Sequence, residues 1–137
     1  MKATKIIVAA IASGIVYFIV SQIIQAAISA VLPYNVLALA GMRSVNDPIM
    51  LFWFLHPIVL GLTMAIIYDK TKKAFTGSTT EKGIEFGSAV WMVAGLPSAF
   101  LVWSSMDYPL GFTMSALIGT AISTITAGII IAKIMEK

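Results

Sequence analysis

The chain contains no cysteine and little charge, and both absences narrow what it can be. Without cysteine it forms no disulfide, no thiolate nucleophile and no cysteine-ligated metal site. Asp, Glu, Lys and Arg make up 11% of the 137 residues, whereas soluble domains have about 25%. No carboxylate pair, metal-ligand cluster or Ser/His/Asp arrangement lies within its apolar stretches. We therefore expect a protein that is not an enzyme and that has no cofactor.

Four long apolar stretches make up most of the sequence. They are Ile6–Leu32, Pro48–Tyr68, Ile84–Ser104 and Pro109–Ile134, and each has at least 21 residues. About 20 apolar residues cross the hydrocarbon core of a bilayer as a helix. Because four spans leave no room for a soluble domain, residues 1–137 are predicted to form a single domain. We expect an all-α, four-transmembrane-helix bundle, multi-pass in the cell membrane, with the lipid bilayer as its main partner.

The basic residues are distributed unevenly around these stretches. Only Arg43 lies in the connection after the first stretch or after the third. Short loops rich in Lys and Arg stay in the cytoplasm, so both termini are predicted to be cytoplasmic. This topology accounts for the net charge of +3 without a nucleic-acid partner. The eight residues on the cytoplasmic side are Lys2, Lys5, Lys70, Lys72, Lys73, Lys82, Lys133 and Lys137.

Sequence signals mark where three of the helices begin. Residues 46–48 (Asn-Asp-Pro) and 107–109 (Asp-Tyr-Pro) place a capping side chain before a proline, which the first helical turn tolerates. Residues 78–81 (Ser-Thr-Thr-Glu) match a capping box, in which both side chains bind backbone N–H groups at the helix start. We therefore expect the second, third and fourth helices to begin at these three points.

Small residues recur at every fourth position of the fourth stretch. This spacing places them on one helix face, where they let two helices approach closely in lipid. The face either packs within the bundle or forms a contact with a second copy or a membrane-complex partner. Its members are Gly111, Ser115, Gly119, Ser123 and Ala127.

Polar residues form a comparable stripe on the first stretch. Unsatisfied amides are costly in hydrocarbon, so we expect the stripe to face other helices or a wet cavity. Hydrogen bonds between helices would account for it without any binding site. The stripe consists of Ser13, Tyr17, Ser21, Gln25 and Ser29, with Gln22 beside them.

Two prolines fall inside predicted helices, and polar side chains accompany them. A proline within a helix frees the carbonyl group four residues earlier and kinks the axis. Pro57 would free the carbonyl of Trp53, and Pro97 would free that of Val93. At a rise of 1.5 Å per residue, both kinks lie roughly 10–15 Å below the outer surface. Kinked helices with polar groups at depth are typical of binding sites in transport proteins.

These positions predict an outward-facing polar pocket. Its candidate binding residues are His56, Gln22, Gln25, Ser98 and Trp53, which three helices place at a similar depth. Alternatively, His56 is a neutral imidazole that forms a hydrogen bond with a glutamine or a freed carbonyl. Haem ligation by His56 would need a second ligand from a methionine or from another copy.

No Asp, Glu, Lys or Arg lies within the four stretches away from their ends, whereas proton-coupled exchangers and pumps usually have a buried carboxylate. We therefore expect a small protein that binds or permeates a neutral or weakly polar solute. The alternative is a structural or accessory subunit of a larger membrane complex.

Overall fold

Every regular element in residues 2–137, the part of the chain that this computed structural model describes, is helical. Four helical runs are long and apolar enough to cross a membrane, and we number them as spans 1–4: Ala3–Val31, Pro48–Ala74, Thr79–Ser105 and Leu110–Met135. The prediction of an all-α fold with four apolar helices of membrane-spanning length is confirmed. The elements are α1 (Lys2–Val31), η1 (Val36–Ala38), η2 (Pro48–Leu55), α2 (His56–Thr71), η3 (Lys72–Ala74), α3 (Thr79–Val90), η4 (Trp91–Gly95), α4 (Leu96–Ser105), α5 (Leu110–Met114), η5 (Ser115–Gly119) and α6 (Thr120–Met135).

Spans 2 and 3 begin where the sequence predicts. The Asp47 carboxylate accepts a hydrogen bond of 2.9 Å from the backbone N–H of Ile49, and Pro48 lies in the first turn. The Ser78 hydroxyl accepts from the N–H of Glu81, whose carboxylate accepts from the N–H of Ser78 at 2.7 Å. Because these bonds satisfy N–H groups that a first turn leaves unpaired, both capping predictions are confirmed.

Span 4 begins differently from the prediction. Pro109 itself occupies the cap position, with φ −55° and ψ 141°, and no side chain caps the first turn. The prediction that Asp107 caps this helix is therefore wrong, because the proline takes the boundary position and leaves Asp107 two residues upstream. The Tyr108 hydroxyl instead donates a hydrogen bond of 3.0 Å to the carbonyl oxygen of Ala40, which ties the connection to the loop after span 1.

Glycines permit the closest helix crossings. A Cβ atom on Gly61 of α2 would collide with the carbonyl oxygen of Ala10 and the backbone of Gly14 in α1. A Cβ atom on Gly128 of α6 would collide with the carbonyl oxygen of Gly83 in α3. The α1–α2 and α3–α6 pairs therefore pack backbone against backbone, as small residues allow in apolar helices.

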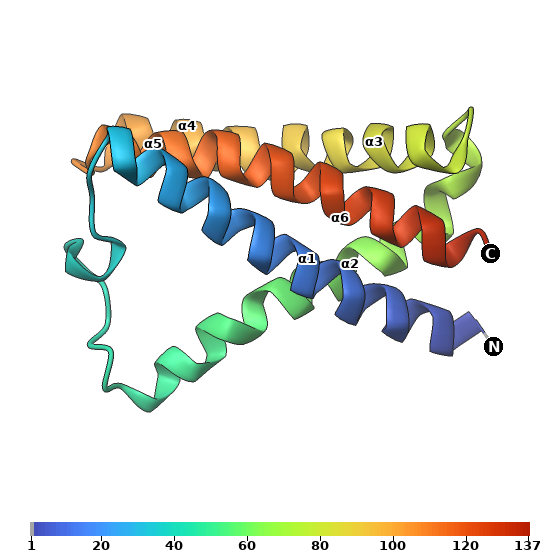
Figure 1. The fold of residues 1–137 in the computed structure, drawn as a ribbon, viewed down its shortest axis with the longest axis horizontal. Coiled ribbons are helices and arrows are strands. Elements are labelled where there is room, and N and C mark those ends of the chain that lie inside the picture. Colours follow the sequence, from blue (N-terminus) through green and yellow to red (C-terminus); the bar gives the residue numbers. More distant parts are fainter. Residues whose placement is uncertain (1) are drawn as a thin grey trace.

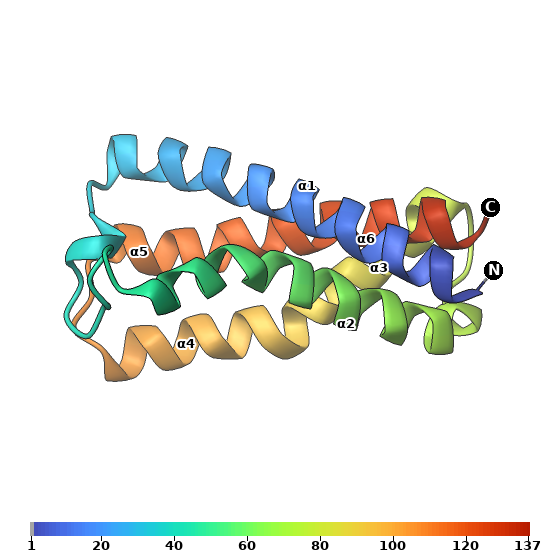
Figure 2. The same cartoon turned by 90° about the horizontal axis from the view of Figure 1, so that it is seen from below.

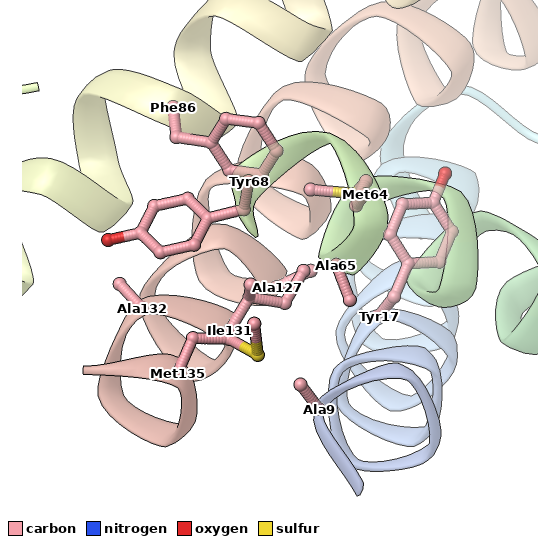
Figure 3. Close-up of a cluster of buried hydrophobic side chains, with 10 residues drawn as sticks. All are labelled: Ala9, Tyr17, Met64, Ala65, Tyr68, Phe86, Ala127, Ile131, Ala132 and Met135. Carbon is pink, nitrogen blue, oxygen red and sulfur yellow. The ribbon is translucent and has the colours of Figure 1, made fainter. Parts of the chain in front are cut away.

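The apolar core lies at the end of the bundle where both termini are found, which we call the terminal end (Figures 1 and 2). All four spans contribute to it, and Tyr68 and Phe86 pack edge to face with ring centroids 5.1 Å apart. Figure 3 shows the buried members: Ala9, Tyr17, Met64, Ala65, Tyr68, Phe86, Ala127, Ile131, Ala132 and Met135.

The opposite end, which we call the far end, is open. Figure 1 shows η2 diverging from α4 and α5 as it runs away from the terminal end. None of the eight residues of η2 is buried, and α4 buries Ala99 alone. The spans pack tightly at the terminal end and diverge toward the far end. A cavity between them can therefore begin in the middle of the bundle, where the tight packing ends.

The small-residue face of span 4 packs inside the chain. A Cβ atom on Gly111 would collide with the carbonyl oxygen of Leu32, and Ala127 belongs to the core. Packing within the bundle therefore accounts for this face, whereas its contact with a second copy or another partner stays a prediction. Gly111, Gly119, Ser123 and Ala127 are buried, and Ser115 is half-buried.

Candidate functional site

A cavity of about 250 Å³ lies in the middle of the bundle. We call it the central cavity; all four spans line it, and its walls are mostly apolar. Its polar side chains are Tyr17, His56, Ser98, Thr120 and Thr124. Its apolar lining is Leu60, Val90, Ala94, Gly95, Ala99, Val102, Phe112 and Ala116.

Local departures from α-helical geometry border this cavity. In span 3, η4 is a π-helical turn in which the N–H of Leu96 bonds to the carbonyl oxygen of Trp91, five residues earlier. Pro97 follows directly, and a π turn is one way to accommodate a residue that lacks an N–H and crowds the preceding turn. In span 4, η5 is a second π-helical turn. Turns of this kind occur frequently at functional sites.

The two π turns contact each other. The indole Nε1 of Trp91 donates a hydrogen bond of 3.1 Å to the carbonyl oxygen of Leu117 in η5. A Cβ atom on Gly95 would lie 2.9 Å from the Thr120 hydroxyl and 2.5 Å from the Trp91 ring. Gly95 therefore lets the two irregular turns pack closely, and both contribute residues to the cavity wall.

His56 and Tyr17 face each other in the part of the cavity wall that spans 1 and 2 contribute. Their ring centroids are 6.4 Å apart in an edge-to-face arrangement. Tyr17 is only 8% exposed, and Figure 3 shows its hydroxyl pointing away from Ala9 and Met135. Within residues 2–137, neither the Tyr17 hydroxyl nor the His56 ring has a hydrogen-bond partner. The cavity therefore contains two polar side chains that have no hydrogen-bond partner among the described residues.

The structure brings together two of the five residues that the sequence predicts for the site. His56 and Ser98 line the central cavity, whereas Gln22, Gln25 and Trp53 do not. Gln22 is exposed, Gln25 is half-buried, and Trp53 is 43% exposed with its ring against Phe54.

The close α1–α2 crossing explains why the glutamines lie elsewhere. Gly14 and Gly61 meet at that crossing, so Tyr17, one turn after Gly14, is the α1 residue that reaches His56. The sequence-based estimate of depth counts residues from the predicted end of each span, which assumes that the helices run parallel and start at the same level. Because α1 is tilted against α2, residues at the same count do not lie at the same depth.

The serines of the polar stripe of α1 form their hydrogen bonds locally. Ser13, Ser21 and Ser29 donate hydrogen bonds to carbonyl oxygens three or four residues earlier in α1 itself. The interhelical bonds that the sequence suggested are therefore not made by these serines, because their own helix supplies nearer acceptors. Tyr17 is the member of the stripe that enters the site, and membership of the stripe was its only sequence signal.

The carbonyl of Trp53 is not left free by Pro57. Residues 48–55 form a 3₁₀ helix, and the backbone N–H of His56 donates to the oxygen of Trp53, three residues earlier. The expectation that this carbonyl is available to the pocket is therefore wrong. The change from 3₁₀ to α geometry takes place at His56.

A charged pair lies at the far end of span 2. The guanidinium of Arg43 donates a hydrogen bond of 2.9 Å to the carboxylate of Asp47. The backbone N–H of Ile49 and the Arg43 guanidinium hold the pKa of Asp47 below its usual value. Arg43 is exposed, and Asp47 caps the helix, as its position before Pro48 predicts.

The central cavity has a lateral neighbour. A groove of about 350 Å³, which we call the lateral groove, runs between α2 and α3. Val90 and Ala94 line both the lateral groove and the central cavity, so the groove and the cavity lie next to each other and share part of the wall that span 3 forms. The lateral groove is lined by Ile67, Thr71, Phe75, Phe86, Ala89, Val90, Val93 and Ala94.

The central cavity presents hydrogen-bonding side chains and no charged ones. Its lining contains no Asp, Glu, Lys or Arg, and among residues 2–137 no group of His, Asp or Glu side chains could hold a metal ion. Its volume lies just below the usual range for drug-sized ligands, about 300–1,000 Å³. No family model, curated protein or solved structure matches this chain.

Proposed function

We propose that this protein binds a small neutral or weakly polar solute in the central cavity. The observation that supports the proposal is a pair of polar groups, the Tyr17 hydroxyl and the His56 ring, that line a mostly apolar cavity and have no hydrogen-bond partner among the described residues. A solute with one or two hydrogen-bonding groups would satisfy them. His56 is exposed and Tyr17 is buried apart from 8% of its surface. Each hydrogen bond that a solute makes to one of them would contribute about 0.5–1.5 kcal/mol.

The proposed solute is uncharged because the cavity offers nothing to neutralise an ion. An isolated ion is expensive to bury in an apolar site. Ser98, Thr120 and Thr124 add hydroxyl groups to the walls, although Thr120 and Thr124 already donate to carbonyls of their own helix. Neutral polyols, amides and short alcohols are the classes that match this lining.

Entry from the far end is the proposed route. The core side chains of Met64, Tyr68 and Phe86 are almost fully buried between the cavity and the terminal end. With the termini in the cytoplasm, as the basic residues predict, the cavity would open outward. Permeation would then require the core to rearrange, so binding is the activity that this conformation favours.

Cysteine protection tests the proposal, because the chain has no cysteine of its own. Ser98→Cys places a thiol in the cavity wall, and Ser104→Cys places one on the exposed part of the same helix. The rate of alkylation by N-ethylmaleimide is measured for both in detergent, with and without a panel of polyols, amides and short alcohols.

We expect at least one class in the panel to slow alkylation at position 98 while leaving position 104 unchanged. Adding His56→Leu to the Ser98→Cys protein should remove this protection, because the solute loses a polar partner. If no class protects position 98, or if both positions are protected equally, the proposed binding function is wrong.

The accessory-subunit function is the second candidate, and one observation favours it. The η2 segment of span 2 exposes a run of large apolar side chains at the far end, namely Leu51, Phe52, Trp53, Phe54 and Leu55. A helix of a partner protein could pack on this face in place of lipid. Purification from the native membrane in mild detergent would test it: a partner retained by the wild-type chain and lost from Phe52→Ala/Phe54→Ala would support the accessory role.

A further inference from the structure

A third hollow, of about 640 Å³, lies at the terminal end of the bundle, away from the central cavity. Figure 1 shows that this end gathers both termini and the connection between α2 and α3. We call it the lysine hollow. Phe75 and Met135 form its apolar part, and its charged side chains are Lys5, Lys72, Lys73, Lys82, Lys137 and Glu136.

Ion pairing leaves most of this positive charge uncompensated. Lys82 pairs with Glu136 at 3.1 Å, and Lys72 pairs with Asp69 at 3.4 Å. Within the described part of the chain, Lys5, Lys73 and Lys137 form no ion pair. The hollow therefore presents three ammonium groups that a bound anion could neutralise.

The single acidic residue of the hollow is already engaged. The Glu136 carboxylate accepts hydrogen bonds from Lys82 and from the Tyr68 hydroxyl, the latter at 2.7 Å. These two donors hold the pKa of Glu136 below its usual value. Glu136 thus fixes the position of Lys82 and does not compete for the three unpaired lysines.

The lateral groove continues from the lysine hollow along the helices. Phe75 lines both the hollow and the lateral groove. From Phe86 to Ala94 the groove follows span 3 for about 12 Å at a rise of 1.5 Å per residue. The groove is accessible from the outer surface of the bundle, since two of its lining residues, Ile67 and Val93, are 49% and 80% exposed. A charged hollow and an apolar groove therefore meet at one aromatic side chain.

We propose that this surface binds one anionic phospholipid, with its phosphate in the lysine hollow and one acyl chain in the lateral groove. Lysines close to a membrane surface attract anionic headgroups. A soluble phosphate compound would use the hollow alone and would leave the groove without a role. Because Phe75 lines both the lysine hollow and the lateral groove, a phospholipid accounts for both features, and we favour it over a soluble phosphate compound.

Lipid retention by the purified full-length chain tests this assignment. The protein in neutral detergent is given phosphatidylglycerol or phosphatidylcholine, and bound lipid is counted by native mass spectrometry. The test variant is Lys73→Gln/Lys137→Gln. Its matched control, Lys70→Gln/Lys133→Gln, removes the same charge at the same end from lysines that do not line the hollow. All four lysines are exposed or at helix ends, and helicity measured by circular dichroism checks folding.

We expect the wild type to bind phosphatidylglycerol and not phosphatidylcholine. Each lysine near an anionic surface contributes roughly a fivefold gain in binding, so the test variant should bind roughly 25-fold more weakly. The control should bind as the wild type does. An equal loss in both double variants would overturn the proposal, because it would mean that diffuse charge, and not the hollow, retains the lipid.

Two further measurements distinguish a lipid from a soluble anion. Ala89→Phe fills the lateral groove and should weaken binding of long-chain phosphatidylglycerol, whereas Met92→Phe on the exposed face of the same span should not. Inorganic phosphate and glycerol phosphate should fail to displace the lipid at equal concentration. Displacement by either, or unchanged lipid binding in a folded Ala89→Phe protein, would overturn the assignment of the acyl chain to the groove.

Discussion

The indole Nε1 of Trp91 and the carbonyl oxygen of Leu117, 3.1 Å apart, join two π-helical turns from different spans. The same carbonyl oxygen also accepts from the backbone N–H and the hydroxyl of Thr120, so the Trp91 indole adds a donor from a neighbouring span. This bond holds together one wall of the central cavity.

Replacing Trp91 with Phe should therefore weaken the bundle. The variant keeps an aromatic ring but loses the hydrogen bond, which is worth about 0.5–1.5 kcal/mol. We expect the free energy of unfolding, measured by titration with sodium dodecyl sulfate in mixed micelles, to fall by that amount. Trp103→Phe is the control, because Trp103 is 62% exposed. Equal losses in the two variants would contradict a structural role for the Trp91 bond.

Gly128 should be far less tolerant of substitution than Gly119. A methyl group at Gly128 would collide with the backbone of α3, and such overpacking costs about 1–3 kcal/mol. At Gly119 the nearest side-chain atom, Cγ2 of Ile24, would lie 3.7 Å away. Gly119→Ala should therefore leave stability unchanged or raise it slightly, by up to about 1 kcal/mol of helix propensity. The same unfolding titration measures both variants, and a milder effect at Gly128 would refute the close α3–α6 crossing.

Glu136 should make stability fall in acid. Because the folded-state pKa of Glu136 is lowered by Tyr68 and Lys82, its stabilising contribution is present above the unfolded pKa, about 4.3. That contribution is lost as the pH falls through the lower, folded-state pKa. We expect the melting temperature to drop between pH 5 and pH 3 in the wild type.

Two variants isolate this contribution in the same pH series. Glu136→Gln removes the titrating group, so its melting temperature should drop less over the same pH range. Glu85→Gln, on the exposed side of α3, should keep the full drop. If Glu136→Gln loses as much stability in acid as the wild type does, another carboxylate is responsible.

The orientation of the bundle is open to a direct labelling test. Single cysteines at Ser78 and at Met106 lie in connections at opposite ends of the bundle. With the termini in the cytoplasm, a membrane-impermeant thiol reagent should label position 106 in intact cells and leave position 78 unlabelled until the cells are broken. Labelling at 78 alone would reverse the predicted topology.

The difference between the residues predicted to share a pocket and those that line the central cavity has a physical origin. Apolar length and capping residues act locally, so the four helices and the caps at Asp47 and Ser78 could be predicted from the sequence. That His56 and Ser98 line one cavity could also be predicted, because a proline beside a polar residue within a span is a local signal. Tyr17 was not singled out, because the rotation and tilt of α1 depend on its contact with α2.

By itself, the sequence determines that the chain is all-helical, that four helices are long and apolar enough to cross a membrane, and that lysines gather around particular connections. These properties follow from composition and from spacing within single segments. Only the tertiary structure decides which faces meet. Close backbone contacts at Gly61 and Gly128 set the helix crossings, and those crossings bring Tyr17 to His56 and place Phe75 between the lysine hollow and the lateral groove. Contacts between segments far apart in sequence leave no periodic signal within either one, so their outcome appears only in the folded bundle.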